Sequence, residues 1–155
     1  YIMSNALSGL AVLALFLPGP EQWKWAYAIS ALVGFFNGPG VPILWAMYAD
    51  TADYAEWRFG RRATGIVFSA ATFGQKFGWG IGGALTGWLL ALFNYVPNMD
   101  QSPEAIFGIK LMLSIIPGTL MIASVILLFF YNLSEDFMLK VQGELNTRRE
   151  QQDKE

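Results

Sequence analysis

The sequence predicts an all-α membrane protein, and three observations predict this fold class. Of the 155 residues, 54% are apolar and only 14% are charged, whereas a soluble domain carries about 25% charged residues. Stretches that are almost free of charge recur along the chain, with short polar segments between them. A helix needs about 20 residues to cross a bilayer, and the last three stretches reach this length, the third with residues to spare. We therefore expect four transmembrane helices.

The four spans are expected at about 1–17, 25–49, 63–95 and 106–131, within a membrane part that covers 1–132. The first span is slightly short. The chain opens directly on apolar sequence, without the charged region and cleavage motif of a signal peptide. We therefore interpret it as a piece of a longer protein.

The basic residues indicate the orientation of the spans. Seven of the ten lie either between the second and third spans or after the fourth. Two spans separate these segments, so both lie on one side of the membrane. Because positively charged loops stay in the cytoplasm, we expect the C-terminus to be cytoplasmic.

Residues 133–155 are expected to form a cytoplasmic tail. Ser134 is a good helix start, followed by two acidic residues that favour the positive end of the helix dipole. Phe137, Val141 and Leu145 make a weak apolar stripe. This pattern favours a short amphipathic helix that lies on the inner membrane surface.

The composition argues against several function classes. The chain has no histidine and no cysteine, so the usual zinc sites, serine–histidine triads and thiolate nucleophiles cannot be built from it alone. A net charge of −2 gives no indication of a nucleic-acid partner. The segment GWGIGG matches G-x-G-x-x-G, but no strand precedes it, as a nucleotide site requires. We expect no enzyme, no metal site and no cofactor.

Lys76 is the most unusual residue of the third span, because it is the only charge between Arg62 and Asp100. A lysine at the centre of a bilayer costs about 2.5–3.5 kcal/mol. Its ammonium group either reaches the interface along the lipid or faces a carboxylate or a water-filled cavity. We favour the cavity, since small or polar residues share its helix face: Ser69, Thr72, Gly80, Gly83 and Gly87.

A second row of small residues lies on a roughly opposite face of the same helix. Gly74, Gly78 and Gly82 are spaced at four residues. This spacing is typical of faces on which another transmembrane helix packs closely. One side of the helix is therefore predicted to pack, and the other to line a space.

The second span contains the segment NGPGVP at 37–42, which must weaken or kink a helix. Such a break marks either a binding site or hinge or a simple kink that improves packing. Pro117 and Gly118 in the fourth span favour the kink interpretation.

The loop DTADYAEWRFGRRATG, residues 50–65, concentrates charge between the second and third spans. Asp50 and Asp53 share a face if the second helix continues through them. The carboxylates can pair with Arg58, Arg61 or Arg62, or with another part of the protein. Exposed pairs contribute only about 0–1 kcal/mol each, so a gate and an ordinary solvated loop are equally good interpretations.

This loop, the lysine in FGQKFGWGIGG and the segment NYVPNMDQSPEAIFGIK together resemble the glycoside–pentoside–hexuronide:cation symporter family. The resemblance covers the whole chain and corresponds to the last third of such a transporter. It implies the major facilitator fold, of which the four spans would be helices 9–12 of twelve. It also implies a bacterial inner-membrane protein, embedded in the lipid bilayer among its own N-terminal helices.

The resemblance implies that this chain helps to bind a sugar substrate and a coupling cation, Na⁺, Li⁺ or H⁺. Lys76 and Thr72 match positions in the central cavity. Val41 lies at a tryptophan position of the family, and Trp45 follows one turn later. On the inner side, the matches to the cytoplasmic gating network are Asp50, Asp53 and Arg62.

Two other functions remain open at this stage. A related branch of similar architecture carries lysophospholipids and also has a lysine in helix 11. A membrane scaffold without transport activity would use the glycine face and would tolerate loss of Lys76. A membrane-embedded hydrolase is disfavoured, because the spans offer only hydroxyl groups and one central lysine.

Overall fold

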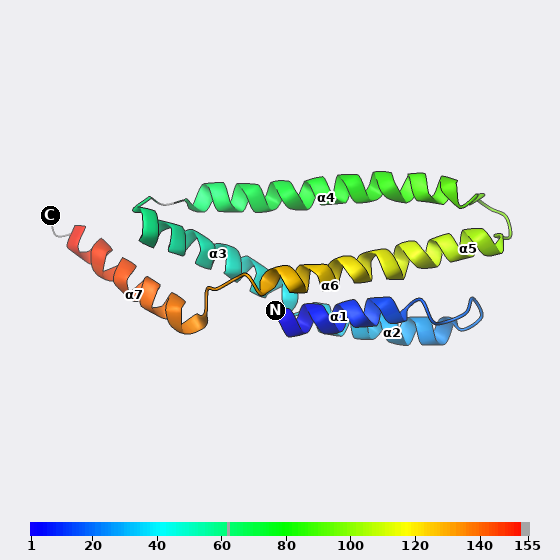
Figure 1. Cartoon of the computed structure of the whole chain (residues 1–155), viewed down its shortest axis with the longest axis horizontal. Helices are drawn as coiled ribbons and strands as arrows, with labels where there is room; N and C mark the ends of the chain where they lie inside the picture. The colour runs from blue at the N-terminus through cyan, green and yellow to red at the C-terminus, as the bar shows by residue number, and fades with distance from the viewer. Residues whose placement is uncertain (62, 153–155) are drawn as a thin grey trace. The chain divides into compact units, whose positions relative to one another are not determined.

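The computed structural model describes residues 1–61 and 63–152, so Arg62 lies outside the described residues. No strand occurs in these ranges, which confirms the predicted all-α class. The helices in chain order are α1 (Ile2–Ala14), α2 (Trp23–Asn37), α3 (Gly40–Phe59), α4 (Thr64–Leu92), α5 (Pro103–Lys110), the π-helix η1 (Leu111–Ile115), α6 (Ile116–Leu128) and α7 (Glu135–Gln152) (Figure 1).

Two helical stretches of the described chain are long and apolar enough to cross a membrane, Trp23–Phe59 and Pro103–Leu128. The helix α1 is apolar but shorter. The helix α4 has 29 residues, but its glycines and the pair Gln75–Lys76 lower its mean hydropathy. Two of the four predicted spans are thus supported by length and composition, while the first and third stay predictions.

The chain divides into two compact units. Unit 1 comprises Tyr1–Val41 with Phe77–Phe130, and unit 2 comprises Pro42–Lys76 with Tyr131–Glu155. The helix α4 contributes its first part to unit 2 and its second part to unit 1.

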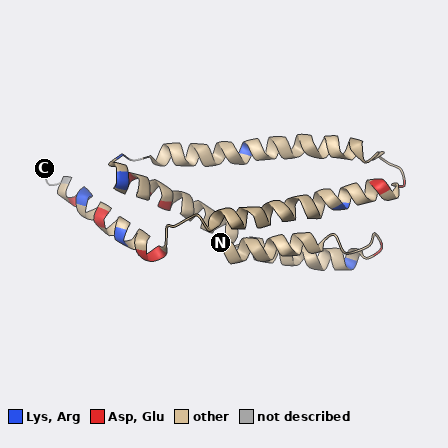
Figure 2. Cartoon of the chain, viewed as in Figure 1, with Lys and Arg blue, Asp and Glu red and all other residues tan. Residues whose placement is uncertain are grey.

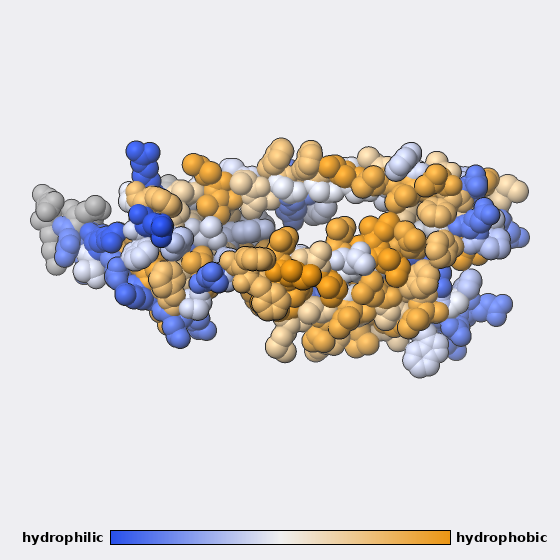
Figure 3. All heavy atoms as spheres, viewed as in Figure 1, coloured by the Kyte–Doolittle hydropathy of each residue, from blue (hydrophilic) through white to orange (hydrophobic). Residues whose placement is uncertain are grey.

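In unit 1, α1 packs against both α2 and α6 (Figure 1). Gly118 of α6 allows this close approach, since a Cβ atom there would lie 2.7 Å from Leu13 of α1. Gly9 of α1 faces α6 in turn, where a Cβ atom would lie 3.1 Å from Cδ1 of Ile122. Small residues at helix contacts are typical of membrane bundles. Apolar side chains dominate the visible surface over these helices (Figure 3).

Buried polar side chains link α1 to its neighbours. The Nδ2 atom of Asn5 donates to Oγ of Ser124 on α6 at 2.6 Å. The hydroxyl of Ser8, which is fully buried, donates to the Val33 carbonyl on α2 at 3.5 Å. Hydrogen bonds of this kind fix the rotation of one apolar helix against another, because an unpaired polar group in a lipid-like interior is costly.

The start of the last apolar stretch is encoded locally. Ser102 is the N-cap of α5, and its Oγ accepts from the Ala105 amide at 3.2 Å. Pro103 follows in the first helical turn, where its missing amide proton is not needed. The π-turn η1 then precedes Pro117, which lacks an N–H group and crowds the preceding turn. The irregularity predicted near Pro117 thus takes the form of a widened turn.

The segment NGPGVP does interrupt the second predicted span. The helix α2 ends at Asn37, and α3 begins at Gly40. Pro39 lies between them, and the boundary of the two units follows at Val41. The break therefore lies where the sequence predicts it, and α3 continues through Asp50 and Asp53.

In unit 2, α7 packs against α3 through side chains. Met138, Val141 and Leu145 are buried in one cluster, with Tyr54 and Trp57 of α3 packed on it. Two residues of the predicted stripe, Val141 and Leu145, thus contact protein, and Phe137 lies at the edge of the same cluster. The helix is also longer than the short one expected.

Candidate substrate cavity and cytoplasmic gate

Lys76 lies near the middle of α4 as the single charged residue of that helix (Figure 2). Its side chain is exposed, and Thr72, one turn earlier, is half-buried. The ion pairs recorded in the described part of the chain join Lys140 to Glu144 and Arg149 to Glu56, so neither involves Lys76. An ammonium group in this position is available to a carboxylate, a polar ligand or water.

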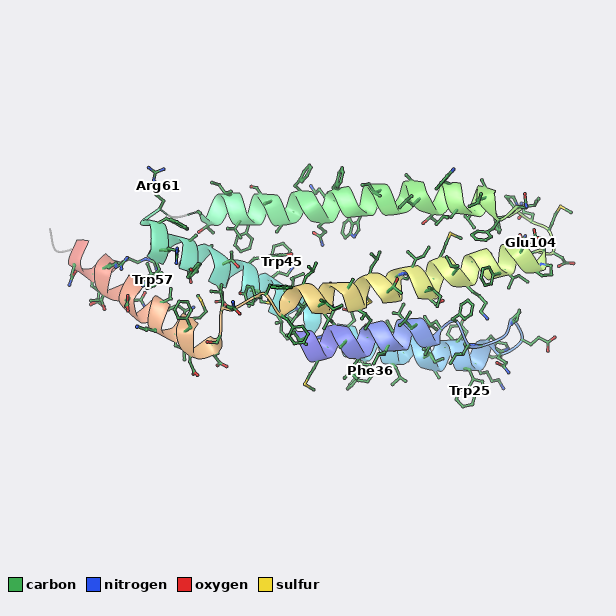
Figure 4. All side chains as sticks on the ribbon, in the orientation of Figure 1. Trp25, Phe36, Trp45, Trp57, Arg61 and Glu104 are labelled. Carbon is green, nitrogen blue, oxygen red and sulfur yellow. The ribbon has the colours of Figure 1, made fainter. Side chains whose placement is uncertain are left out.

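Trp45 of α3 belongs to an aromatic group within unit 2 that also contains Tyr48 of α3 and Phe68 of α4. Its ring stacks on Phe68 with centroids 5.9 Å apart and 22° between the planes, and Tyr48 meets both rings edge-on. Trp45 keeps 41% of its surface exposed, and its side chain is labelled on α3 in Figure 4. The exposed part of this tryptophan can contact a further ring. Val41, in the first turn of α3, is 57% exposed.

The glycine row predicted to pack is open in the structure. A Cβ atom at Gly74, Gly78 or Gly82 would meet nothing within 4 Å. The same holds for Gly80, Gly83 and Gly87 on the lysine face. Both faces of α4 therefore have open space beside their glycines. The assignment of one face to helix packing stays a prediction.

The predicted gate residues are only partly placed together. Asp50 and Asp53 are both half-buried on α3, three residues apart. The third member, Arg62, is outside the described residues. Arg58 donates from Nη1 to the Tyr54 hydroxyl at 3.1 Å, so its recorded partner is a tyrosine within the same helix.

The partner of the acidic segment comes from the tail. Glu56 accepts from Nη2 of Arg149 on α7 at 2.9 Å. Nε1 of Trp57 donates to Oε2 of Glu144 at 2.7 Å, and Nη1 of Arg148 donates to the Trp57 carbonyl at 3.2 Å. Figure 4 shows Trp57 on α3, beside α7. Glu56 is therefore paired with another part of the protein, and the partners of Asp50 and Asp53 stay predictions.

Sequence reasoning missed these α3–α7 contacts. The signal that could have found them is the pairing of two short apolar stripes, Tyr54 with Trp57 and Val141 with Leu145, each flanked by opposite charges. Either stripe alone is equally suited to a membrane surface.

Comparisons with known proteins agree with the resemblance drawn from the motifs. The family model described as MFS/sugar transport protein matches residues 1–135. A glucuronide carrier protein homolog of Escherichia coli strain K12 is 32% identical over 132 residues, which is 84% of this chain and 29% of that protein. An uncharacterized symporter of Bacillus subtilis strain 168 is 37% identical over 148 residues, or 96% of this chain and 32% of that protein.

These matches also show how much of the relatives' length the chain covers. It spans about a third of the length of these curated relatives. No solved structure matches it. The relatives are transport proteins of a membrane family and not enzymes. Because the family model covers most of the residues, including the lysine helix and the charged loop, the chain belongs to the MFS/sugar transport protein family.

Proposed function

We propose that this chain supplies four helices to one half of a cation-coupled sugar symporter that works by alternating access. The observation that carries the proposal is Lys76, a lone charge on a 29-residue helix within the part of the chain that the sugar-transport family model matches. The names of the relatives, a glucuronide carrier protein homolog and a symporter, support the same substrate class and coupling.

Lys76 has an electrostatic role in this proposal. A lysine in a transporter cavity neutralises nearby carboxylates when no cation is bound. When the coupling cation binds those carboxylates, the ammonium is released and becomes available to a sugar hydroxyl or carboxylate. Cation and sugar affinities are then linked through one side chain. Thr72, Trp45 and Val41 would contact the sugar.

The cytoplasmic gate is a second part of the proposal. Asp50, Asp53 and Arg62 would form exposed ion pairs on the inner side, each contributing about 0–1 kcal/mol. Weak pairs suit a gate that must open in every cycle. The contacts of Glu56 and Trp57 with α7 would hold the tail against this region.

Uptake into proteoliposomes that contain the full-length transporter tests the proposal. Radiolabelled glycosides, pentosides and hexuronides are offered with and without an imposed gradient of Na⁺, Li⁺ or H⁺. We expect accumulation of at least one sugar that requires one of the gradients. Absence of sugar uptake under every gradient, in protein that retains its helical circular dichroism, contradicts the proposal.

A further inference from the structure

Unit 1 contains a pocket to which the proposed function assigns no role. It lies among the α1–α2 loop, α2 and the stretch from α5 into η1, and it has a volume of about 510 Å³. Its walls are largely apolar, with Leu15, Ile106, Ile109 and Leu113 among them. The pocket is partly open to the surface. We call it the Lys110 pocket, after the one charged residue that lines it.

Lys110 is an unusual residue in these surroundings. Its side chain is half-buried, and Nζ lies 4.9 Å from the centroid of the Phe16 ring. Neither of the ion pairs recorded among the described residues involves it. An ammonium group beside apolar walls gains most from an anion, because burial without a counter-charge is costly.

The chain around Lys110 is shaped for a ligand. The π-turn η1 begins at the next residue and brings Leu113 into the wall. Such turns inside α-helices are frequent at functional sites. The segment Pro18–Gly19–Pro20 also lines the pocket, and its two proline rings stiffen the backbone there. A wall that is already rigid loses little entropy when a ligand binds.

The lining selects among ligand classes. A sugar would need several hydrogen-bonding partners for its hydroxyl groups, and unpaired ones are costly. Besides Lys110, the side chains of the lining that carry a polar group are Trp23, with a single indole N–H, and Ser30, whose hydroxyl already donates to the Ala26 carbonyl of its own helix at 2.8 Å. One cation beside a long apolar wall matches a phosphate group joined to a hydrocarbon chain.

We propose that the Lys110 pocket binds an anionic phospholipid, whose phosphate pairs with Lys110 and whose acyl chain lies along Ile109 and Leu113. Trp23 lines the pocket and is 58% exposed, and an indole at this place suits the headgroup region of a bilayer. The lipid would fasten the α1–α2 loop to the start of the last span. The inference goes beyond sugar transport and rests only on the chain lying in a bilayer.

Lipid binding to the purified full-length protein tests the inference. The delipidated protein is titrated with phosphatidylglycerol and, separately, with phosphatidylethanolamine of the same acyl chains, and the bound lipid is counted by native mass spectrometry. We expect phosphatidylglycerol to bind more tightly. Lys110→Gln should weaken its binding about fivefold, the contribution of one basic side chain near a membrane surface.

Three further variants separate the pocket from general surface charge. Lys24→Gln removes the same charge from a lysine that lies over the Trp23 ring but does not line the pocket, and it should leave binding unchanged. Lys110→Arg keeps the charge and should keep the preference for phosphatidylglycerol. Ala26→Phe fills the pocket and should lower binding of this lipid.

Other results would overturn the inference. Equal binding of the two lipids, an equal loss in Lys24→Gln and Lys110→Gln, or undiminished binding in Ala26→Phe each contradict it. Sugar uptake is measured separately, so a protein that transports no sugar but shows this lipid pattern would refute only the proposed function.

Discussion

Glycines in this chain differ in what surrounds them, and that difference decides their role. At Gly118 a Cβ atom would lie 2.7 Å from two atoms of Leu13 and 3.1 Å from its backbone nitrogen. At Gly87 a Cβ atom would meet nothing within 4 Å. The contact between α1 and α6 therefore depends on the absence of a side chain at Gly118.

We predict that Gly118→Val destabilises the α1–α6 contact by about 1–3 kcal/mol, the usual cost of overpacking. Thermal unfolding of the full-length protein in detergent, followed by circular dichroism, measures the effect. Gly87→Val is the control, because it adds the same side chain where space is open, although the β-branched residue slightly lowers helix propensity in both. Equal melting temperatures for the two variants would contradict the role of Gly118.

The buried amide of Asn5 is a second feature at this scale. We predict that Asn5→Leu lowers stability by about 0.6–1.7 kcal/mol, the range of hydrogen bonds between membrane helices. The bond to Ser124 is short, at 2.6 Å, and Asn5 is only 9% exposed. A double-mutant cycle with Ser124→Ala measures the coupling. If the changes in unfolding free energy of the two single variants simply add in the double variant, the two side chains do not stabilise each other.

At the scale of the elements, α7 is held on α3 mainly by apolar burial. Val141 is fully buried, and burying a side chain of its size contributes about 1.5–3 kcal/mol. The pair of Arg149 and Glu56 leaves 45% and 18% of the two side chains exposed, and such pairs contribute about 0–1 kcal/mol. The ion pair therefore contributes more to the alignment of α7 along α3 than to the stability of their contact.

We predict that Val141→Asp releases α7 from α3, because a buried carboxylate without a partner is costly. Leu139→Asp is the matched control, since Leu139 lies on α7 with 63% of its surface exposed. Limited trypsin digestion should cut the tail near Arg148 and Arg149 faster in Val141→Asp than in the control. Equal digestion rates would contradict the docking of α7.

The elements also show how far sequence reasoning reaches. Proline and glycine act locally, so the break at NGPGVP and the irregularity near Pro117 could be predicted from the residues alone. The docking of α7 could not, because a stripe such as Val141 and Leu145 can be buried by lipid or by protein. The packing glycines, Gly9 and Gly118, carry no mark that distinguishes them from the more regular row in α4.

The candidate site is itself a prediction from the sequence. A lone lysine on an apolar helix identifies Lys76 from composition and cost alone. Its partners could not be predicted, because the proposed cavity would bring together helices that are distant in the sequence. The chain spans about a third of the length of its relatives. Neither of the two ion pairs recorded among the described residues involves Lys76.

At the scale of the whole molecule, the charged residues of this chain fall into two groups by their place in the sequence. In our proposal the basic residues near the tail and the charged loop set the orientation and the gate, whereas Lys76 lies near the middle of the 29-residue helix α4 as its single charge. We therefore attribute ion coupling to Lys76 and not to the surface charges. Loss of a surface lysine, such as Lys140, should leave transport unchanged, because its pair with Glu144 joins two largely exposed groups at 4.0 Å.

The most direct measurement compares gradient-driven sugar uptake by the wild-type full-length transporter with uptake by Lys76→Ala, with Lys140→Ala as the control for charge. We predict that Lys76→Ala loses coupled accumulation by roughly tenfold or more, the factor that corresponds to about 1.4 kcal/mol, while Lys140→Ala accumulates sugar as the wild type does. Unchanged accumulation by Lys76→Ala, in protein folded as the wild type is, would contradict the role given to this lysine.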